Sequence, residues 1–298
     1  MQVGFFFWPY TLDLCEQLAE RADRYGYAMI GIADTPGNAM DPWVSAAMVA
    51  RASRRARVAV CVTNLLTRHP AISAAAIASL DHVSNGRAVL GIGAGHSGTK
   101  NVGLPKSRAS ELAEGVTFIK TLLKGAPATL RGARAHLSWI ERAPPVFLAA
   151  SHPQPLQAAG RASGDIEIWQ IAALDCNEDR NAARNKIGAM LAFLAGYVIG
   201  DKHLETRGVP EPLRAPLLEL RRRYSTRPGD ADIRLVEELG LFDYLSRRLS
   251  ICGNPQDCLA QALAAKAAGA GRLMLTVSLA SDPVRTVELF GEHVLPKL

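Results

Sequence analysis

Short apolar runs alternate with amphipathic stretches along almost the whole chain of 298 residues. Runs rich in β-branched residues predict buried strands, and apolar residues at helical spacing predict amphipathic helices. The expected strands are Val3–Trp8, Ala28–Ala33, Arg57–Thr63, Ala88–Ile92, Val146–Ala149, Ile166–Ile171, Leu249–Cys252 and Leu273–Val277. The expected helices are Leu12–Tyr25, Trp43–Ala52, Ala71–Val83, Arg108–Leu123, Pro155–Ala162, Pro255–Ala268 and Pro283–Val294.

Eight such strand and helix units predict an α/β fold, a (β/α)8 TIM barrel that occupies residues 1–298 as one domain. Residues 178–248 interrupt the rhythm with proline-punctuated helical stretches, which we interpret as a helical insertion or cap. Residues 128–142 are short and irregular, as in a hairpin. Alternation alone does not distinguish a closed barrel from an open, doubly wound sheet. In a barrel, the active site lies at the C-terminal ends of the strands.

Charge and cysteine content exclude several functional classes. The net charge is +6, but the basic residues are scattered apart from Arg221–Arg223, and aromatic residues make up only 6%, so nucleic-acid binding is not expected. Five cysteines without a CxxC pair suggest neither a disulfide framework nor a zinc site. The longest apolar runs are too short to span a bilayer, and no signal peptide is visible. We therefore expect a cytoplasmic protein that acts on a small molecule.

Polar residues follow several of the expected strands. Asp34 comes directly after the second strand, and the third ends in a segment with Thr63, Asn64, Arg68 and His69. One interpretation gives these side chains a role in ligand binding. In the other, Thr63 and Asn64 form a turn while Arg68 and His69 cap the next helix.

Two further loops suit an anionic or flat ligand. Gly93 and Gly95 follow the fourth strand and let backbone approach a ligand closely, although their spacing is not that of a Rossmann fingerprint. Ala150, Ser151 and His152 follow the fifth strand and open a helix, where free N–H groups favour a phosphate.

The stretch VTNLLTRHPAISAAAIASLDHVSNGRAVLGIGAG resembles the luciferase-like monooxygenase superfamily, in particular its branch of methylenetetrahydromethanopterin reductases that depend on coenzyme F420. Weaker similarity covers VFLAASHPQPLQAAGRASGD and the C-terminal LSICGNPQDCLAQALAAKAAGAGRLMLTVS. The resemblance implies a barrel that holds a deazaflavin or flavin ring over strands two to four, with its phosphate after strand five.

The resemblance also assigns cofactor-binding positions. It places Asp34 near the ring, and Cys61 and Val62 on a bulge whose non-proline peptide bond is cis. The other positions that it implies are Thr63 and Asn64 beside the bulge, Gly93 and Gly95 along the channel, and Ala150, Ser151 and His152 at the phosphate turn. The catalytic residue is left unassigned, because the first strand has Phe6 where the reductases carry a carboxylate; His152 likewise stands where their phosphate turn has glycine.

Three hypotheses follow. The first is an oxidoreductase that transfers hydride between coenzyme F420 and an organic substrate. The second is an FMN-dependent monooxygenase of the same fold, and the third is a barrel that binds a ligand without catalysis. The resemblance further implies a homodimer that buries the second and third helices.

Overall fold

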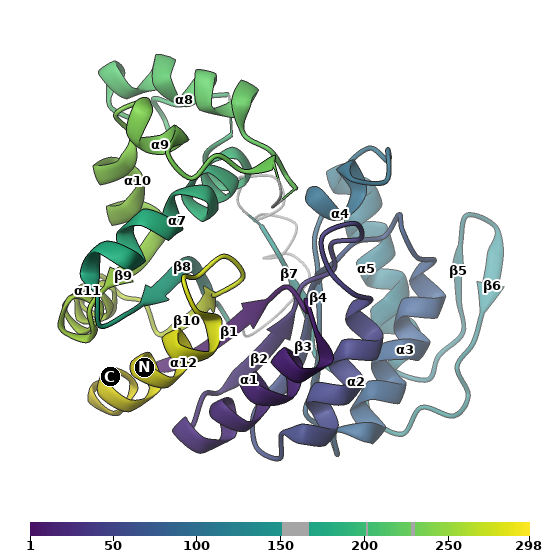
Figure 1. Ribbon diagram of the computed structural model, residues 1–298. Helices are drawn as coiled ribbons and strands as arrows, with labels where there is room; N and C mark the ends of the chain where they lie inside the picture. The colour runs from purple at the N-terminus through teal and green to yellow at the C-terminus, as the bar shows by residue number, and fades with distance from the viewer. Residues whose placement is uncertain (151–166, 201, 228–229) are drawn as a thin grey trace. The chain divides into compact units, whose positions relative to one another are not determined.

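The computed structural model describes residues 1–150, 167–200, 202–227 and 230–298, and it divides into two compact units (Figure 1). We call Trp8–Asp23 with Ala28–Glu167 the N-terminal unit. We call Met1–Phe7, Arg24–Tyr27 and Ile168–Leu298 the C-terminal unit.

The N-terminal unit is built on four parallel strands in the order β7, β4, β3, β2. Their bounds are Met29–Ile32 for β2, Arg57–Thr63 for β3, Ala88–Ile92 for β4 and Val146–Leu148 for β7. β2 and β4 are buried along their whole length, as expected of strands covered on both faces. The predicted strands of this unit are thus confirmed to within a residue or two at each end.

Helices pack side by side along these strands (Figure 1). They are α1 (Leu12–Tyr25), α2 (Pro42–Ala52), α3 (Pro70–Val83) and α5 (Ala109–Leu123). Pro42 and Pro70 each occupy a first helical turn, where a missing N–H is tolerated. The short α4 (Ser97–Lys100) was not predicted, since one turn has no periodicity to detect. The predicted hairpin is confirmed as antiparallel β5 (Ala128–Leu130) and β6 (Ala133–Ala135).

The C-terminal unit contains parallel strands in the order β1, β10, β8, β9. Their bounds are Gln2–Phe7 for β1, Gln170–Cys176 for β8, Ser250–Gly253 for β9 and Arg272–Thr276 for β10. The predicted strand Ile166–Ile171 is corrected, since β8 extends to Cys176. β8 pairs with β10 on one side and with β9 on the other. β8 is longer and its last four residues are buried, which suits a strand with partners on both sides.

Helices make up most of the described part of residues 178–248. They are α7 (Arg180–Leu194), η1 (Ala195–Ile199), α8 (Glu211–Arg223), α9 (Leu235–Glu238) and α10 (Phe242–Leu249). They share a hydrophobic core that includes Leu191, Leu220 and Leu245 together with Ala173 of β8. The unit closes with α11 (Pro255–Ala267), α12 (Pro283–His293) and η3 (Leu295–Lys297).

Candidate active site at the strand ends of the N-terminal unit

The C-terminal ends of β2, β3, β4 and β7 meet at one edge. Because the strands are parallel and in register at Ile32 with Val60 and at Ile92 with both Thr63 and Leu148, the residues that follow them lie close together. This register gathers predicted site residues from the four loops that follow these strands.

The end of β3 departs from regular pairing. Its register with β4 shifts between Val60 and Thr63, and the peptide bond between Cys61 and Val62 is cis. The cis bond predicted from the family resemblance is therefore confirmed. Gly91 on β4 leaves room for this bulge, since a Cβ there would lie 3.0 Å from the Val60 carbonyl oxygen and 3.1 Å from Val62 Cγ1.

Beside the bulge lies a patch of backbone and small apolar side chains. A Cβ on Gly93 would lie 3.3 Å from Val62 Cγ2 and 3.6 Å from Ala149 Cβ. Val62 and Ala149 are only half-buried, so this patch keeps an exposed side. A planar ring can lie against such a surface, because no side chain of Gly93 stands in its way.

A carboxylate borders this patch. The hydroxyl of Thr63, the residue after Val62, donates a hydrogen bond of 2.6 Å to Asp34 Oδ2. Partial burial raises the pKa of Asp34, while the Thr63 bond and the charge of Arg68 act in the opposite direction and Asp41 raises it further. The patch and this polar edge together fit a flavin-type ring.

Asn64 and His69 serve the local fold. Asn64 Oδ1 accepts hydrogen bonds from the N–H groups of Leu66 and Thr67, and its Nδ2 donates to Thr67 Oγ1. His69 Nδ1 accepts a bond from Ala71 N and caps α3. These contacts match the interpretation in which Asn64 forms a turn and His69 caps the next helix. Arg68, which the same interpretation also made a cap, instead lies over the Trp43 ring and 3.7 Å from Asp41.

Helix α4 holds the loop after β2 in place. Gly98 lies against the Asp34 backbone, since a Cβ there would come within 2.6 Å of its carbonyl oxygen. Asn101 donates to Asn38 Oδ1 at 2.9 Å. Gly95 has φ +93, a conformation that favours glycine and turns the chain into α4.

Of the remaining predicted positions, two are described by the structure and two are not. Cys61 is half-buried, and burial raises the pKa of its thiol to about 12, so it is not a thiolate at neutral pH. Ala150 lies two residues after the end of β7 and is half-buried. Ser151 and His152 lie outside the described residues. Within the described ranges, no group of three or more His, Cys, Asp or Glu side chains is arranged to hold a metal ion.

The C-terminal unit holds a buried carboxylate that sequence reasoning missed. Asp175 on β8 accepts bonds of 2.7 Å from both the N–H and the hydroxyl of Ser281, and one of 3.3 Å from Thr286. Burial raises the pKa of Asp175 to about 6. The only signal in the sequence is an acid within an apolar run.

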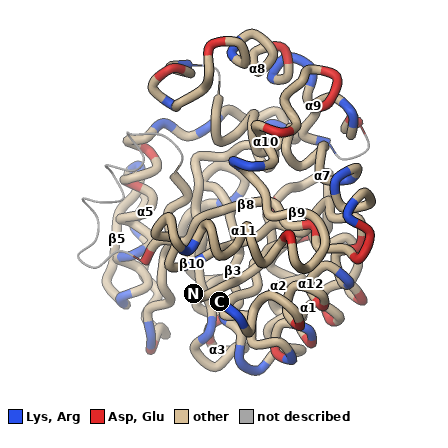
Figure 2. Tube along the Cα trace, turned by 90° about the vertical axis from the view of Figure 1, so that its left-hand side faces the viewer, with Lys and Arg blue, Asp and Glu red and all other residues tan. Residues whose placement is uncertain are grey.

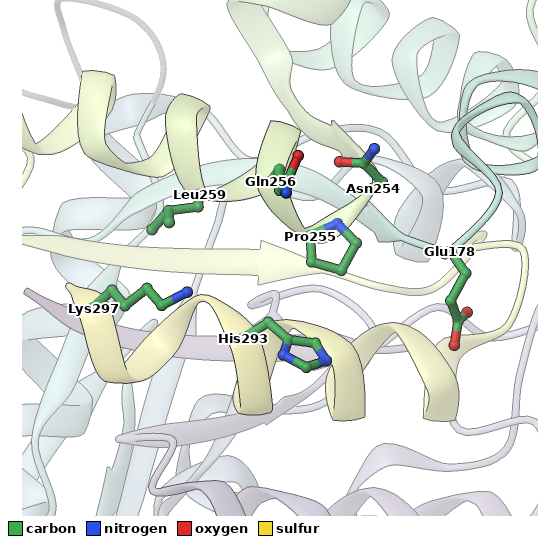
Figure 3. A pocket seen from close by; sticks show the side chains of 7 residues that line it. All are labelled: Glu178, Asn254, Pro255, Gln256, Leu259, His293 and Lys297. Atoms are coloured by element: carbon green, nitrogen blue, oxygen red, sulfur yellow. The ribbon is translucent and has the colours of Figure 1, made fainter.

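A groove of about 490 Å³ lies on the same unit, between α11 and α12 (Figure 3). Its lining residues are Glu178, Asn254, Pro255, Gln256, Leu259, His293 and Lys297. Arg285 pairs with Glu178, and Asn254 caps α11, so these polar groups already have structural roles. We therefore place the candidate site at the strand ends of the N-terminal unit.

Comparison with known proteins decides the family. The profile of the luciferase-like monooxygenase family matches residues 10–163, just over half of the chain. The chain belongs to this family. It is an enzyme of the oxidoreductase class, as predicted.

The chain is also similar to individual relatives over more than nine-tenths of its length. It is 24% identical to a 5,10-methylenetetrahydromethanopterin reductase of Methanolobus tindarius over 93% of this chain and 94% of that protein. The structure of the coenzyme F420-dependent tetrahydromethanopterin reductase of Methanopyrus kandleri superposes with a TM-score of 0.76 at 18% identity, over 99% of both chains.

A third relative uses a different cofactor. It is the oxygenating constituent of 3,6-diketocamphane monooxygenase from Pseudomonas putida, a type II Baeyer–Villiger monooxygenase solved with FMN. It superposes with a TM-score of 0.65 at 18% identity, over 100% of this chain and 99% of that one. These likenesses confirm the predicted TIM-barrel fold over the doubly wound alternative.

Two surface properties complete the description. None of the described helices is long and apolar enough to cross a membrane. Both charge types occur on α8, which carries Glu211, Arg214 and Glu219 before its terminal Arg221–Arg223, whereas α9 carries Glu237 and Glu238 and no Lys or Arg (Figure 2).

Proposed function

We propose that the protein is a coenzyme F420-dependent oxidoreductase that exchanges hydride with a small organic substrate. The observation that carries the proposal is the patch of Val62, Gly93 and Ala149 beside the Asp34–Thr63 pair. The F420-dependent reductases, which match this chain over nine-tenths or more of its length, support the choice of cofactor.

When bound, the deazaflavin supplies the carbon that accepts or donates hydride, and the protein supplies orientation and electrostatics. The patch would support one face of the ring, and Asp34 and Thr63 would border its polar edge. Ala150, Ser151 and His152 would hold the phosphate, because they follow β7 where the chain re-enters a predicted helix.

An FMN-dependent monooxygenase is the second candidate. The specific observation in its favour is the FMN-bound monooxygenase of the same fold. The same patch would support either ring, so the affinities for coenzyme F420 and FMN decide between the two candidates.

Titration of the purified protein with each cofactor tests the proposal. We expect saturable quenching of deazaflavin fluorescence and at least tenfold weaker binding of FMN. Gly93→Val should reduce affinity by more than tenfold, whereas Gly271→Val should not, because Gly271 has open space around it. Binding of FMN alone would favour the monooxygenase. Binding without turnover across a broad substrate panel would favour a ligand-binding barrel. If neither cofactor binds, both the F420-dependent oxidoreductase and the FMN-dependent monooxygenase are contradicted.

We also propose a cytoplasmic homodimer that buries α2 and α3. Val44 on α2 and Ile72 on α3 are 61% and 55% exposed at the starts of these neighbouring helices. Light scattering should report a dimer that Val44→Glu with Ile72→Glu converts to a monomer. A monomeric wild-type protein at micromolar concentration would contradict this assembly.

A further inference from the structure

Asp34 accepts fewer hydrogen bonds than the buried carboxylates of Asp175 and Asp81. Thr63 bonds to its Oδ2, and no donor among the described residues reaches its Oδ1. Asp175 accepts three side-chain or backbone bonds, and Asp81 accepts two. A half-buried carboxylate with one oxygen held and one open can bond a ligand without disturbing the fold.

The charged groups around Asp34 come from three elements. Asp41 caps α2, and Arg68 lies in the loop after β3. α4, whose Gly98 lies against the Asp34 carbonyl, has His96 before it and Lys100 in its last turn. No described cation forms an ion pair with Asp34, so its charge is balanced only at longer range.

We propose that Asp34 is the acid–base residue of the reaction and exchanges the substrate proton through its open Oδ1 oxygen. This inference rests on the proposed hydride transfer. In the oxidative direction, the substrate C–H bond would break and its hydrogen would leave with the bonding electron pair as a hydride, which the bound deazaflavin would accept. The O–H or N–H bond on the same carbon's heteroatom breaks, its proton moves to Asp34, and a C=O or C=N bond forms. The reductive direction reverses each transfer.

Other nearby groups are less suited to this role. The thiol of Cys61 has its pKa raised to about 12, and the Nδ1 atom of His69 is engaged in capping α3. The resemblance places a carboxylate on the first strand, but this chain has Phe6 there. The raised pKa of Asp34 brings it closer to the pH at which proton exchange is efficient.

Thr63 acts as a positioning residue. Its hydroxyl donates to Oδ2, which leaves Oδ1 free of this bond and stabilises the charged form. Removing this donor should therefore raise the pKa of Asp34 further.

The test measures proton uptake when coenzyme F420 binds, so it needs no substrate. A ring seated against the patch excludes water from Oδ1 and disfavours the charged carboxylate, so binding should take up a proton at Asp34. Calorimetric titrations in two buffers of different ionisation enthalpy, repeated over a range of pH, give the number of protons taken up. Asp34→Asn should abolish this uptake and keep affinity within about tenfold, since the amide retains an acceptor oxygen.

Three further variants separate the role of Asp34 from a structural one. Thr63→Val should move the midpoint of uptake to higher pH, and Thr63→Ser should restore it. Asp41→Asn keeps a helix-capping residue and removes a neighbouring negative charge, so uptake should persist with its midpoint at lower pH. Carbon-13 NMR of the carboxyl groups in the cofactor-free protein, with Asp34→Asn for assignment, should show Asp34 titrating above the ordinary value of about 3.9.

The outcomes distinguish the two proposals. Failure of both coenzyme F420 and FMN to bind overturns the proposed function and this inference with it. Binding of coenzyme F420 with equal proton uptake in wild type and Asp34→Asn, or titration of Asp34 at or below the ordinary value, overturns the inference alone. Uptake that disappears only in Asp34→Asn and shifts as predicted in Thr63→Val supports it.

Discussion

The two ends of the strands in the N-terminal unit hold their polar groups differently. At the N-terminal end, the Arg87 guanidinium makes five hydrogen bonds of 2.6 to 3.0 Å, and Asp23 accepts from three successive N–H groups before β3. At the C-terminal end, Asp34 has one hydrogen bond and Gly93 presents bare backbone. One end stabilises the fold, and the other leaves groups available for a ligand.

Replacing Arg87 should produce the largest effect on stability. Its guanidinium bonds to Ser84 O, Ser53 O, Ser53 Oγ, Ala56 O and Ala50 O. Arg87→Met leaves these acceptors without a donor and should lower the free energy of unfolding by about 2–4 kcal/mol in urea denaturation. Arg54→Met, which changes an exposed side chain, should alter it by less than about 0.5 kcal/mol. Equal effects of the two variants would remove the contrast between the ends.

Asp175 tests whether a raised pKa alone marks a site. In the folded protein its pKa is about 6. The folded state therefore binds its proton more tightly than the unfolded state, and stability should fall as pH rises from roughly 4 to about 6. The free energy of unfolding should fall by about 2–3 kcal/mol over this range, because each unit of pKa difference between the folded and unfolded states corresponds to about 1.4 kcal/mol.

Asp175→Asn should remove this pH-dependent loss in urea denaturation at pH 4 and pH 7. Ser281→Ala should enlarge it, because Ser281 donates to the charged carboxylate. Unchanged profiles would mean that Asp175 does not titrate in this range. If confirmed, the raised pKa belongs to a structural carboxylate, and the open oxygen rather than the pKa distinguishes Asp34.

Much of the N-terminal unit could be predicted from its sequence. β3, β4 and α1 have the predicted bounds because their apolar patterns are local and uninterrupted. β8 was misplaced because Asp175 interrupts its apolar run, and the partners that allow its burial lie 106 and 111 residues further along the chain. Local pattern does not carry that information.

The candidate site was predicted unevenly for similar reasons. The positions of Asp34, Thr63 and Gly93 follow from their places after strands. The alignment of Gly91 and Ala149 with Val62 depends on strand register, which no single segment encodes. The engagement of Asn64 in its own turn was visible in the sequence only as an alternative.

Replacing Asp34 should have the smallest effect on stability. The change should be a gain, whereas Arg87→Met at the N-terminal ends of the strands should cause a loss. Because burial raises the pKa of Asp34 in the folded state, its charge disfavours folding once pH rises above the ordinary range for aspartate. Asp34→Asn should match wild type at low pH and become slightly more stable than it at neutral pH, as followed by thermal melting. A loss of stability at neutral pH would show that the carboxylate supports the fold.

The most direct test of the account is a cofactor titration that compares the two ends of the same strands. Wild type and Arg87→Met, measured at a temperature where both are folded, should bind coenzyme F420 with affinities within about threefold, and Gly93→Val should bind more than tenfold more weakly. Weaker binding by Arg87→Met than by Gly93→Val, or no binding by wild type, would contradict a cofactor site at the C-terminal ends of these strands.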